Sequence, residues 1–237
     1  MKTLRCLLMI LAVAGVSVGA PASVFEEDFE SYPVGPLHGK GGWKGWNNNP
    51  AAGAPVTTKF AAGGTQSVEI LGSSDLAHEF KLTGGKYILS ARQYIPSGGT
   101  GISDFILLNT YADNGTNDWS IQTQYHLATG AITCWHGGRA GATEIAFDQW
   151  VEIKLRINLD ENTFEEFYHG QPIAAGQWDD HAHGTLQAID LYGNGASSVY
   201  YDDIRIEAYY VYQAVHPEPA DRAIGVLESY RRSYPKD

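Results

Sequence analysis

The sequence has little cysteine and few basic residues. Its two cysteines are Cys6 and Cys134, and Cys6 lies in a leader that we expect to be removed, so a disulfide framework is excluded. We expect Cys134 to share a buried strand face with Ile132; a disulfide to a second chain is the alternative. Sixteen lysines and arginines against 27 acidic residues give a net charge of −11. Such a surface repels phosphate backbones, so we expect no nucleic-acid partner.

Long apolar runs are also lacking, apart from one at the N-terminus. Lys2 and Arg5 precede an apolar stretch over 7–20, and residues 20–22 (APA) match a small-x-small cleavage site. A helix needs about 20 apolar residues to cross a bilayer. We therefore predict a signal peptide over residues 1–22 and a secreted or cell-surface protein without a stable membrane anchor. A retained N-terminal anchor is the alternative.

Strand formers and glycine-rich turns dominate the rest of the chain. Over residues 150–159 aliphatic side chains alternate with polar ones, which is the period of a half-buried strand. Similar runs occupy 24–30, 66–71, 76–82, 86–95, 102–112, 118–127, 131–136, 163–169, 172–178, 186–192 and 199–208. Short turns between them favour antiparallel pairing, because parallel strands need long crossovers. We predict an all-β fold, a sandwich of two antiparallel sheets.

Two segments depart from this pattern. Residues 31–65 are rich in glycine, proline, alanine and asparagine, so we expect a long ordered loop over one sheet. Near the C-terminus, residues 220–233 have an acidic first turn and a basic last turn, which suits a short helix. We predict a sandwich domain over 23–208 and a C-terminal tail with a short helix over 209–237.

Motifs at both ends of the predicted domain and within it carry a family resemblance. They are 27–35 (EDFESYPVG), 41–46 (GGWKGW), 94–98 (YIPSG), 105–109 (FILLN), 149–153 (QWVEI), 192–196 (YGNGA) and 199–206 (VYYDDIRI). Together they resemble secreted bacterial domains of the concanavalin A-like lectin/glucanase superfamily, which includes laminin G-like modules. The resemblance covers residues 24–208 and implies a jelly-roll sandwich. That superfamily contains lectins, glucanases and alginate lyases, so no single activity is implied.

The tail also resembles a known signal. Residues 216–220 (HPEPA) and the later Arg231 and Arg232 are similar to a Pro-Glu-Pro carboxy-terminal sorting tail. Such tails hold a continuous hydrophobic span before the arginines, whereas acidic and basic residues interrupt it here. We therefore expect no working anchor.

Three acidic residues near the domain ends suggest a cation site. Alternation puts Asp202 on the core-facing side of the last strand with Ile204, where a carboxylate needs a partner. Asp28 and Glu30 share a face of the first strand, and the first and last strands are neighbours in the resembling folds. These oxygens suit Ca²⁺, so we predict a structural calcium ion. The alternative is that Asp202 or Asp203 accepts hydrogen bonds from backbone amides at a bulge.

A glycine-rich loop offers a candidate carbohydrate-binding surface. Sugar rings present apolar C–H faces, so saccharide sites combine flat aromatic side chains with hydrogen-bonding groups. Trp43 and Trp46 lie in this loop with Asn48, and we predict that they form such a site. Anchoring of the loop by the two rings is the alternative.

The strand over 118–127 offers a second surface. Gln122, Gln124 and His126 share one polar face of this strand, as a saccharide groove requires; a merely solvated face is the alternative. Trp119 falls on the opposite face by alternation. We expect the strand tryptophans in the core: Trp119, Trp135, Trp150 and Trp178.

Catalytic signatures are scarce. Retaining glucanases of the superfamily carry acids at alternate positions of one strand, about 5 Å apart, and no predicted strand does so. Residues 124–126 (QYH) match the Gln-x-His string of alginate lyases, which implies His126 as a candidate base, but the accompanying motifs are absent. Serine-hydrolase, Walker and zinc-protease motifs are absent too. His181 and His183 suit chelation of a transition metal if their segment is extended; a solvated loop is the alternative.

These observations lead to one functional prediction with two alternatives. We predict a secreted, non-catalytic domain that binds a polysaccharide or another glycan, as a lectin or an adhesion domain does. No catalytic residue is predicted. The first alternative is a polysaccharide-cleaving enzyme on the same fold, either a lyase or a glycosidase. The second is a structural protein of the cell envelope.

Overall fold

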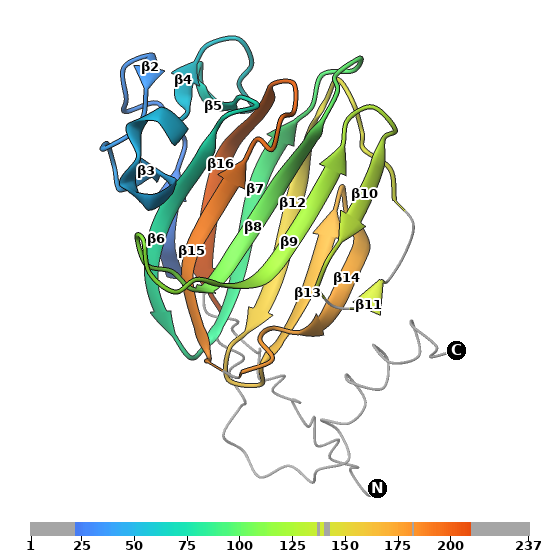
Figure 1. The fold of residues 1–237 in the computed structure, drawn as a ribbon. Coiled ribbons are helices and arrows are strands. Elements are labelled where there is room, and N and C mark those ends of the chain that lie inside the picture. Colours follow the sequence, from blue (N-terminus) through green and yellow to red (C-terminus); the bar gives the residue numbers. More distant parts are fainter. Residues whose placement is uncertain (1–21, 137, 140–142, 182, 210–237) are drawn as a thin grey trace, which may run out of the picture. The chain divides into compact units, whose positions relative to one another are not determined.

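A computed structural model shows a sandwich of two antiparallel β-sheets (Figure 1). It describes residues 22–136, 138–139, 143–181 and 183–209. The predicted signal peptide, except its last residue, and the predicted tail, except its first, lie outside the described residues. The boundaries of the sandwich domain and the helix in the C-terminal tail therefore stay predictions. In the described part of the chain, no helix is long and apolar enough to cross a bilayer.

Among the described residues, ten strands form the larger sheet. They are β1 (Ala22–Glu27), β2 (Gly35–Pro36), β4 (Pro55–Thr57), β5 (Ser67–Ile70), β7 (Lys86–Tyr94), β11 (Gly138–Arg139), β12 (Trp150–Asn158), β13 (Thr163–Tyr168), β14 (Gln171–Gln177) and β16 (Val199–Ala208). Their order is β11-β14-β13-β12-β7-β16-β5-β4-β2, and β1 also pairs with β16.

Six described strands form the smaller sheet. They are β3 (Trp43–Gly45), β6 (Asp75–Thr83), β8 (Ile102–Thr110), β9 (Asp118–His126), β10 (Ala131–Cys134) and β15 (Thr185–Tyr192). Their order is β10-β9-β8-β15-β6-β3. Two short 3₁₀ turns follow β3, namely η1 (Trp46–Asn48) and η2 (Pro50–Ala52).

All pairings between these strands are antiparallel, which confirms the predicted fold class. The long strands match the segments expected from alternation to within a few residues. The prediction of one long loop over 31–65 is wrong. Within this segment β3 pairs with β6 in the smaller sheet, and β4 pairs with β5 in the larger. Strands of two or three residues are too short for alternation to reveal them.

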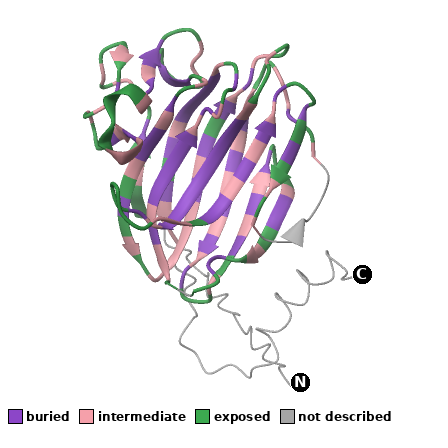
Figure 2. Cartoon of the chain, viewed as in Figure 1, coloured by how far each residue is buried: buried purple, intermediate pink, exposed green. Residues whose placement is uncertain are grey.

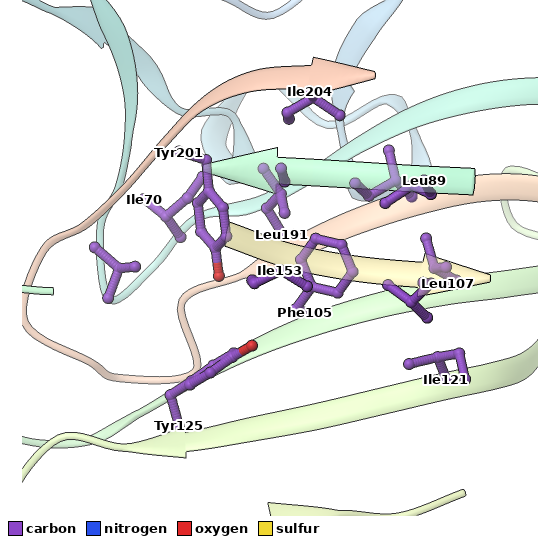
Figure 3. Packing of buried hydrophobic residues seen from close by; sticks show 14 of the residues in the cluster. Ile70, Leu89, Phe105, Leu107, Ile121, Tyr125, Ile153, Leu191, Tyr201 and Ile204 are labelled. Atoms are coloured by element: carbon purple, nitrogen blue, oxygen red, sulfur yellow. The ribbon is translucent and has the colours of Figure 1, made fainter. Parts of the chain in front are cut away.

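The inner faces of the two sheets meet in one apolar core (Figure 3). Along strands of both sheets, buried residues alternate with more exposed ones (Figure 2); in β12, Val151 and Ile153 are buried while Glu152 between them is not. Burial of such a side chain contributes about 1.5–3 kcal/mol. The rows of inward-facing apolar side chains therefore determine which face of each sheet points away from the core.

One acidic side chain lies in this core. Glu166 in β13 is 1% exposed, and the Thr123 hydroxyl in β9 donates to its two carboxyl oxygens at 2.8 and 2.9 Å. Burial raises the pKa of Glu166 to about 7, against the lowering effect of the Thr123 hydrogen bond. The folded state therefore favours the protonated carboxyl.

We predict that Glu166→Gln stabilises the protein as pH rises. In the unfolded chain this carboxyl ionises near its ordinary pKa of 4.5, and in the folded chain only near 7. Wild-type stability therefore falls as pH rises through this window, by up to about 3 kcal/mol. Urea denaturation at pH values below and above the window measures the free energy of unfolding of both proteins.

Glu165→Gln is the matched control. The Glu165 side chain is 42% exposed and pairs with Arg156 at 3.2 Å. We expect no pH-dependent gain from this variant. Parallel pH profiles for wild type and Glu166→Gln would contradict the assignment of a buried, protonated carboxyl.

Candidate functional site

A β-bulge in β9 turns one tryptophan away from the core. Leu108 of β8 lies opposite Trp119 of β9, and the register of the two strands shifts on both sides of this pair. The shifts leave Ser120 in β9 and Asn109 in β8 without a paired residue on the other strand. Both extra residues are buried, and Asn109 Nδ2 donates to the Ser120 hydroxyl at 3.1 Å. A bulge re-aims the neighbouring side chain. Trp119 is consequently 40% exposed on the outer face of the smaller sheet.

Trp119 borders an open groove of about 550 Å³ on this outer face. Strands β6, β8, β9 and β15 form its floor, and η1 contributes one wall. Its lining includes Trp46, Trp119, Tyr192, Asp75, Asp190 and Gln122. The groove thus combines large aromatic rings with amide and carboxyl groups.

The aromatic wall is held in place by its own contacts. The rings of Trp46 and Trp119 stack, with centroids 6.5 Å apart and planes inclined by 15°. Tyr111 packs edge-on against Trp46 at 4.9 Å, and its hydroxyl donates to Asp113 at 2.9 Å. Lys44 lies 5.1 Å from the Tyr111 ring centroid and pairs with Asp113 at 2.6 Å. The rings are therefore positioned without a ligand.

Three carboxyl groups gather on this face, one from each of three neighbouring strands. Asp75 in β6 and Asp104 in β8 both lie opposite Tyr192 of β15, and Asp190 lies two residues before Tyr192. Asp190 is 3% exposed, and its Oδ1 has no hydrogen-bond partner among the described residues. A buried carboxylate without compensation is costly, so this site favours the neutral form.

The carboxyls of Asp75 and Asp190 lie close enough to affect each other's ionisation. Burial, the charge of Asp75, a hydrogen bond with Asp75 and the charge of Asp104 together raise the pKa of Asp190 well above its ordinary value. Burial also raises the pKa of Asp75, against the hydrogen bond with Asp190. Asp104 instead accepts from Gln122 Nε2 at 3.2 Å and Asn194 Nδ2 at 3.0 Å.

A second exposed tryptophan lies beside the groove. The backbone N–H of Trp135 donates to the C=O of Gln122 at 3.0 Å, so the β9–β10 pairing extends to this residue. Cys134 before it packs against the core, and alternation then directs Trp135 to the outer face. Its 64% exposure agrees with this position.

The predicted loop site divides into a buried and an exposed part. Trp43 is 0% exposed, packs on Phe29 at 5.7 Å and donates from Nε1 to Glu27 at 3.0 Å. The prediction that Trp43 contacts a ligand is therefore wrong, and the anchoring alternative describes it. Trp46 lines the groove. Asn48 is exposed in η1 but does not line the groove.

The predicted polar face of β9 lies outside the core. Gln122 lines the groove, Gln124 lies opposite Asp104 in the β8 pairing, and His126 Nε2 is 3.2 Å from the Thr133 hydroxyl. Their role as glycan ligands stays a prediction.

The strand tryptophans were expected in the core, with mixed outcome. Trp178 is 1% exposed, as expected, whereas Trp150 is half-buried against Tyr94 on the face opposite the buried Val151, which corrects its prediction. Trp119 and Trp135 are exposed, which corrects the prediction for both. The bulge explains Trp119, and the outward position beside Gln122 explains Trp135.

The predicted calcium ligands accept hydrogen bonds from backbone amides. Asp202 accepts from the N–H groups of residues 62, 63 and 203. Glu30 accepts from those of residues 65 and 66, both at 2.7 Å. Asp28 is exposed and accepts from the N–H of Glu30. The three carboxylates do not gather closely enough to share an ion, so the amide-bonded alternative describes Asp202 and this geometry does not favour Ca²⁺.

Among the comparisons with known proteins, the one with solved structures found matches. No protein-family model and no curated protein matches the chain. A solved sialidase superposes with a TM-score of 0.50 at 12% identity, over 93% of this chain and 21% of its own. Domain 4 of AbnA, a GH43 extracellular arabinanase from Geobacillus stearothermophilus solved with arabinotriose, gives a TM-score of 0.47 at 13% identity, over 80% and 93% of the two chains. The likeness to the sialidase shows the fold, and this chain spans about a fifth of that enzyme's length.

We predict that Trp43→Ala and Trp46→Ala differ strongly in their effect on stability. Loss of the buried Trp43 ring leaves a cavity and removes one of the two hydrogen bonds to Glu27 Oε2, so the free energy of unfolding should fall by about 3–5 kcal/mol. Trp46→Ala removes a ring at the surface and should cost about 1 kcal/mol. Urea denaturation followed by circular dichroism measures both. Similar losses in the two variants would contradict the assigned positions.

Proposed function

We propose that this domain binds a glycan on the outer face of its smaller sheet. The observation that carries the proposal is an exposed, pre-positioned tryptophan in a groove lined by hydrogen-bonding groups. Sugar rings stack their C–H faces on such rings, while their hydroxyls bond to amides and carboxyls. Trp119 supplies the ring, and Gln122 and Asp75 supply the polar groups.

The arrangement suits an extended, uncharged glycan. Trp119 and Trp135 flank Gln122 on one face, so more than one sugar unit finds an aromatic ring. Three acidic side chains lie in or beside the groove, and the net charge of −11 adds a negative field, which disfavours anionic glycans. Rings that are already fixed also reduce the entropy lost on binding.

We predict that Trp119→Ala weakens glycan binding about tenfold or more, because the stacking surface is lost. A glycan array identifies the ligand, and calorimetry with that glycan measures the affinity. Trp150→Ala is the matched control, since Trp150 lies half-buried on the larger sheet and should leave the affinity unchanged.

Two results would overturn the proposal. Unchanged affinity in Trp119→Ala would remove the groove as the binding site. An array without any bound glycan would leave the structural envelope protein as the remaining candidate.

Asp190 favours a second candidate function, cleavage of the bound glycan. A carboxyl that stays protonated in a groove is suited to donate a proton to a leaving group. Burial and the neighbouring charge of Asp75 raise the pKa of Asp190 well above its ordinary value, in the direction that this role requires. His126, which the resemblance to alginate lyases implies as a base, does not line the groove.

If the groove cleaves glycans, we expect Asp190→Asn to abolish release of new reducing ends while binding persists. Wild-type cleavage should fall as pH rises, because the acid must be protonated. Reducing-end and unsaturated-product assays with the bound glycan measure this. Loss of cleavage in His126→Ala, with Asp190→Asn active, would favour the lyase instead. If the wild-type protein binds the glycan but releases no cleavage product, the groove binds glycans without cleaving them.

A further inference from the structure

A second chemical cluster lies where the chain crosses from the larger sheet to the smaller. It consists of Asp118, which opens β9, and of Asp179, His181 and His183, which lie between β14 and β15. One ligand atom from each residue lies within 4.8 Å of the others. Two imidazoles and two carboxylates therefore converge from segments far apart in the sequence.

The separations of the donor atoms suit a tetrahedral metal ion. Zinc bonds of about 2.1 Å place neighbouring ligand atoms about 3.4 Å apart. Asp118 Oδ2 lies 3.5 Å from His181 Nδ1 and 3.9 Å from His183 Nδ1. His183 Nδ1 lies 2.6 Å from Asp179 Oδ2 as a hydrogen bond. A cation would replace the proton of that bond, and the two atoms would move apart to share the ion.

Asp179 is fixed by the fold itself. Its side chain is 0% exposed, and its two oxygens accept from the backbone N–H groups of His181 and His183. The Asn162 side chain makes two hydrogen bonds to the backbone of Asp179. It accepts from the N–H at 3.0 Å and donates to the C=O at 2.7 Å. One ligand is thus in position before an ion arrives, which lowers the cost of binding.

The other ligands are free to adjust. The side chains of His181 and His183 are 67% and 42% exposed. His181 Nδ1 contacts Asp180 at 2.6 Å, and the Asp180 side chain is 81% exposed. An ion pair between exposed side chains stabilises little, so exchanging Asp180 for a metal ion costs His181 little.

We propose that Asp118, Asp179, His181 and His183 bind a structural zinc ion. Imidazole nitrogens with carboxylate oxygens suit Zn²⁺, whereas Ca²⁺ takes oxygen ligands alone. Four protein ligands fill a tetrahedral shell, which is typical of a structural site. The ion ties the crossover between the sheets to the first residue of β9, directly before Trp119.

Zinc titration of the chelator-treated full chain tests the proposal. Calorimetry should show one ion bound per chain, and the melting temperature should rise with zinc, because the ion binds the folded state. Cobalt offers a second readout, since tetrahedral Co²⁺ absorbs strongly in the visible range and octahedral Co²⁺ does not. In His181→Ala/His183→Ala all three signals should be lost. Both side chains are well exposed, so circular dichroism should show an intact fold.

His169→Asn is the matched control. His169 is an exposed histidine in the turn after β13, with a φ of 49° that asparagine tolerates. This variant should bind zinc as wild type does, and Asp118→Asn should weaken binding at least about tenfold through loss of one charged ligand. No bound zinc in wild type, an octahedral cobalt spectrum, or equal zinc affinity in the double variant would each overturn the proposal.

Discussion

Face-to-face packing of the two sheets is the constraint on which the rest of this structure depends. Every long strand gives alternate side chains to the space between the sheets, as Phe105, Ile153 and Leu191 do (Figure 3). Because that burial supplies the main stabilising free energy, the inner faces are not available for a ligand. The outer face of the smaller sheet buries a smaller apolar cluster that includes Ile106 and Leu108, and it carries the aromatic and polar groups of the groove.

Two departures from regular sheet structure give that face its chemistry. The bulge between β8 and β9 exposes Trp119, and its extra residues Ser120 and Asn109 satisfy each other by a hydrogen bond. Asp190 is buried although it belongs to the outer face, and burial with the neighbouring charge of Asp75 raises its pKa well above the ordinary value. Both features cost stability locally. A fold tolerates such costs where a site needs them.

Strand order brings these groups together. Asp75, Asp104 and Asp190 are far apart in the chain, yet β6, β15 and β8 are adjacent in the smaller sheet. An acid motif within one strand is therefore not the only way to pair carboxyls on this fold. The cluster around Asp179 follows the same logic, because the start of β9 and the β14–β15 connection meet only after the sheets have packed.

The sequence by itself determined the long strands, the antiparallel sandwich and the polar face with Gln122, because side-chain alternation is a property of a single strand. It also pointed to the tryptophan loop, but it did not distinguish Trp43, whose ring fills the core, from Trp46, whose ring lines the groove. The exposure of Trp119 depends on how β8 and β9 shift against each other. The paired acids and the histidine–aspartate cluster depend on neighbours from distant segments. Beyond Gln122 and the His181–His183 pair, such contacts leave no spacing in the sequence, so the tertiary structure decided which further residues join each site.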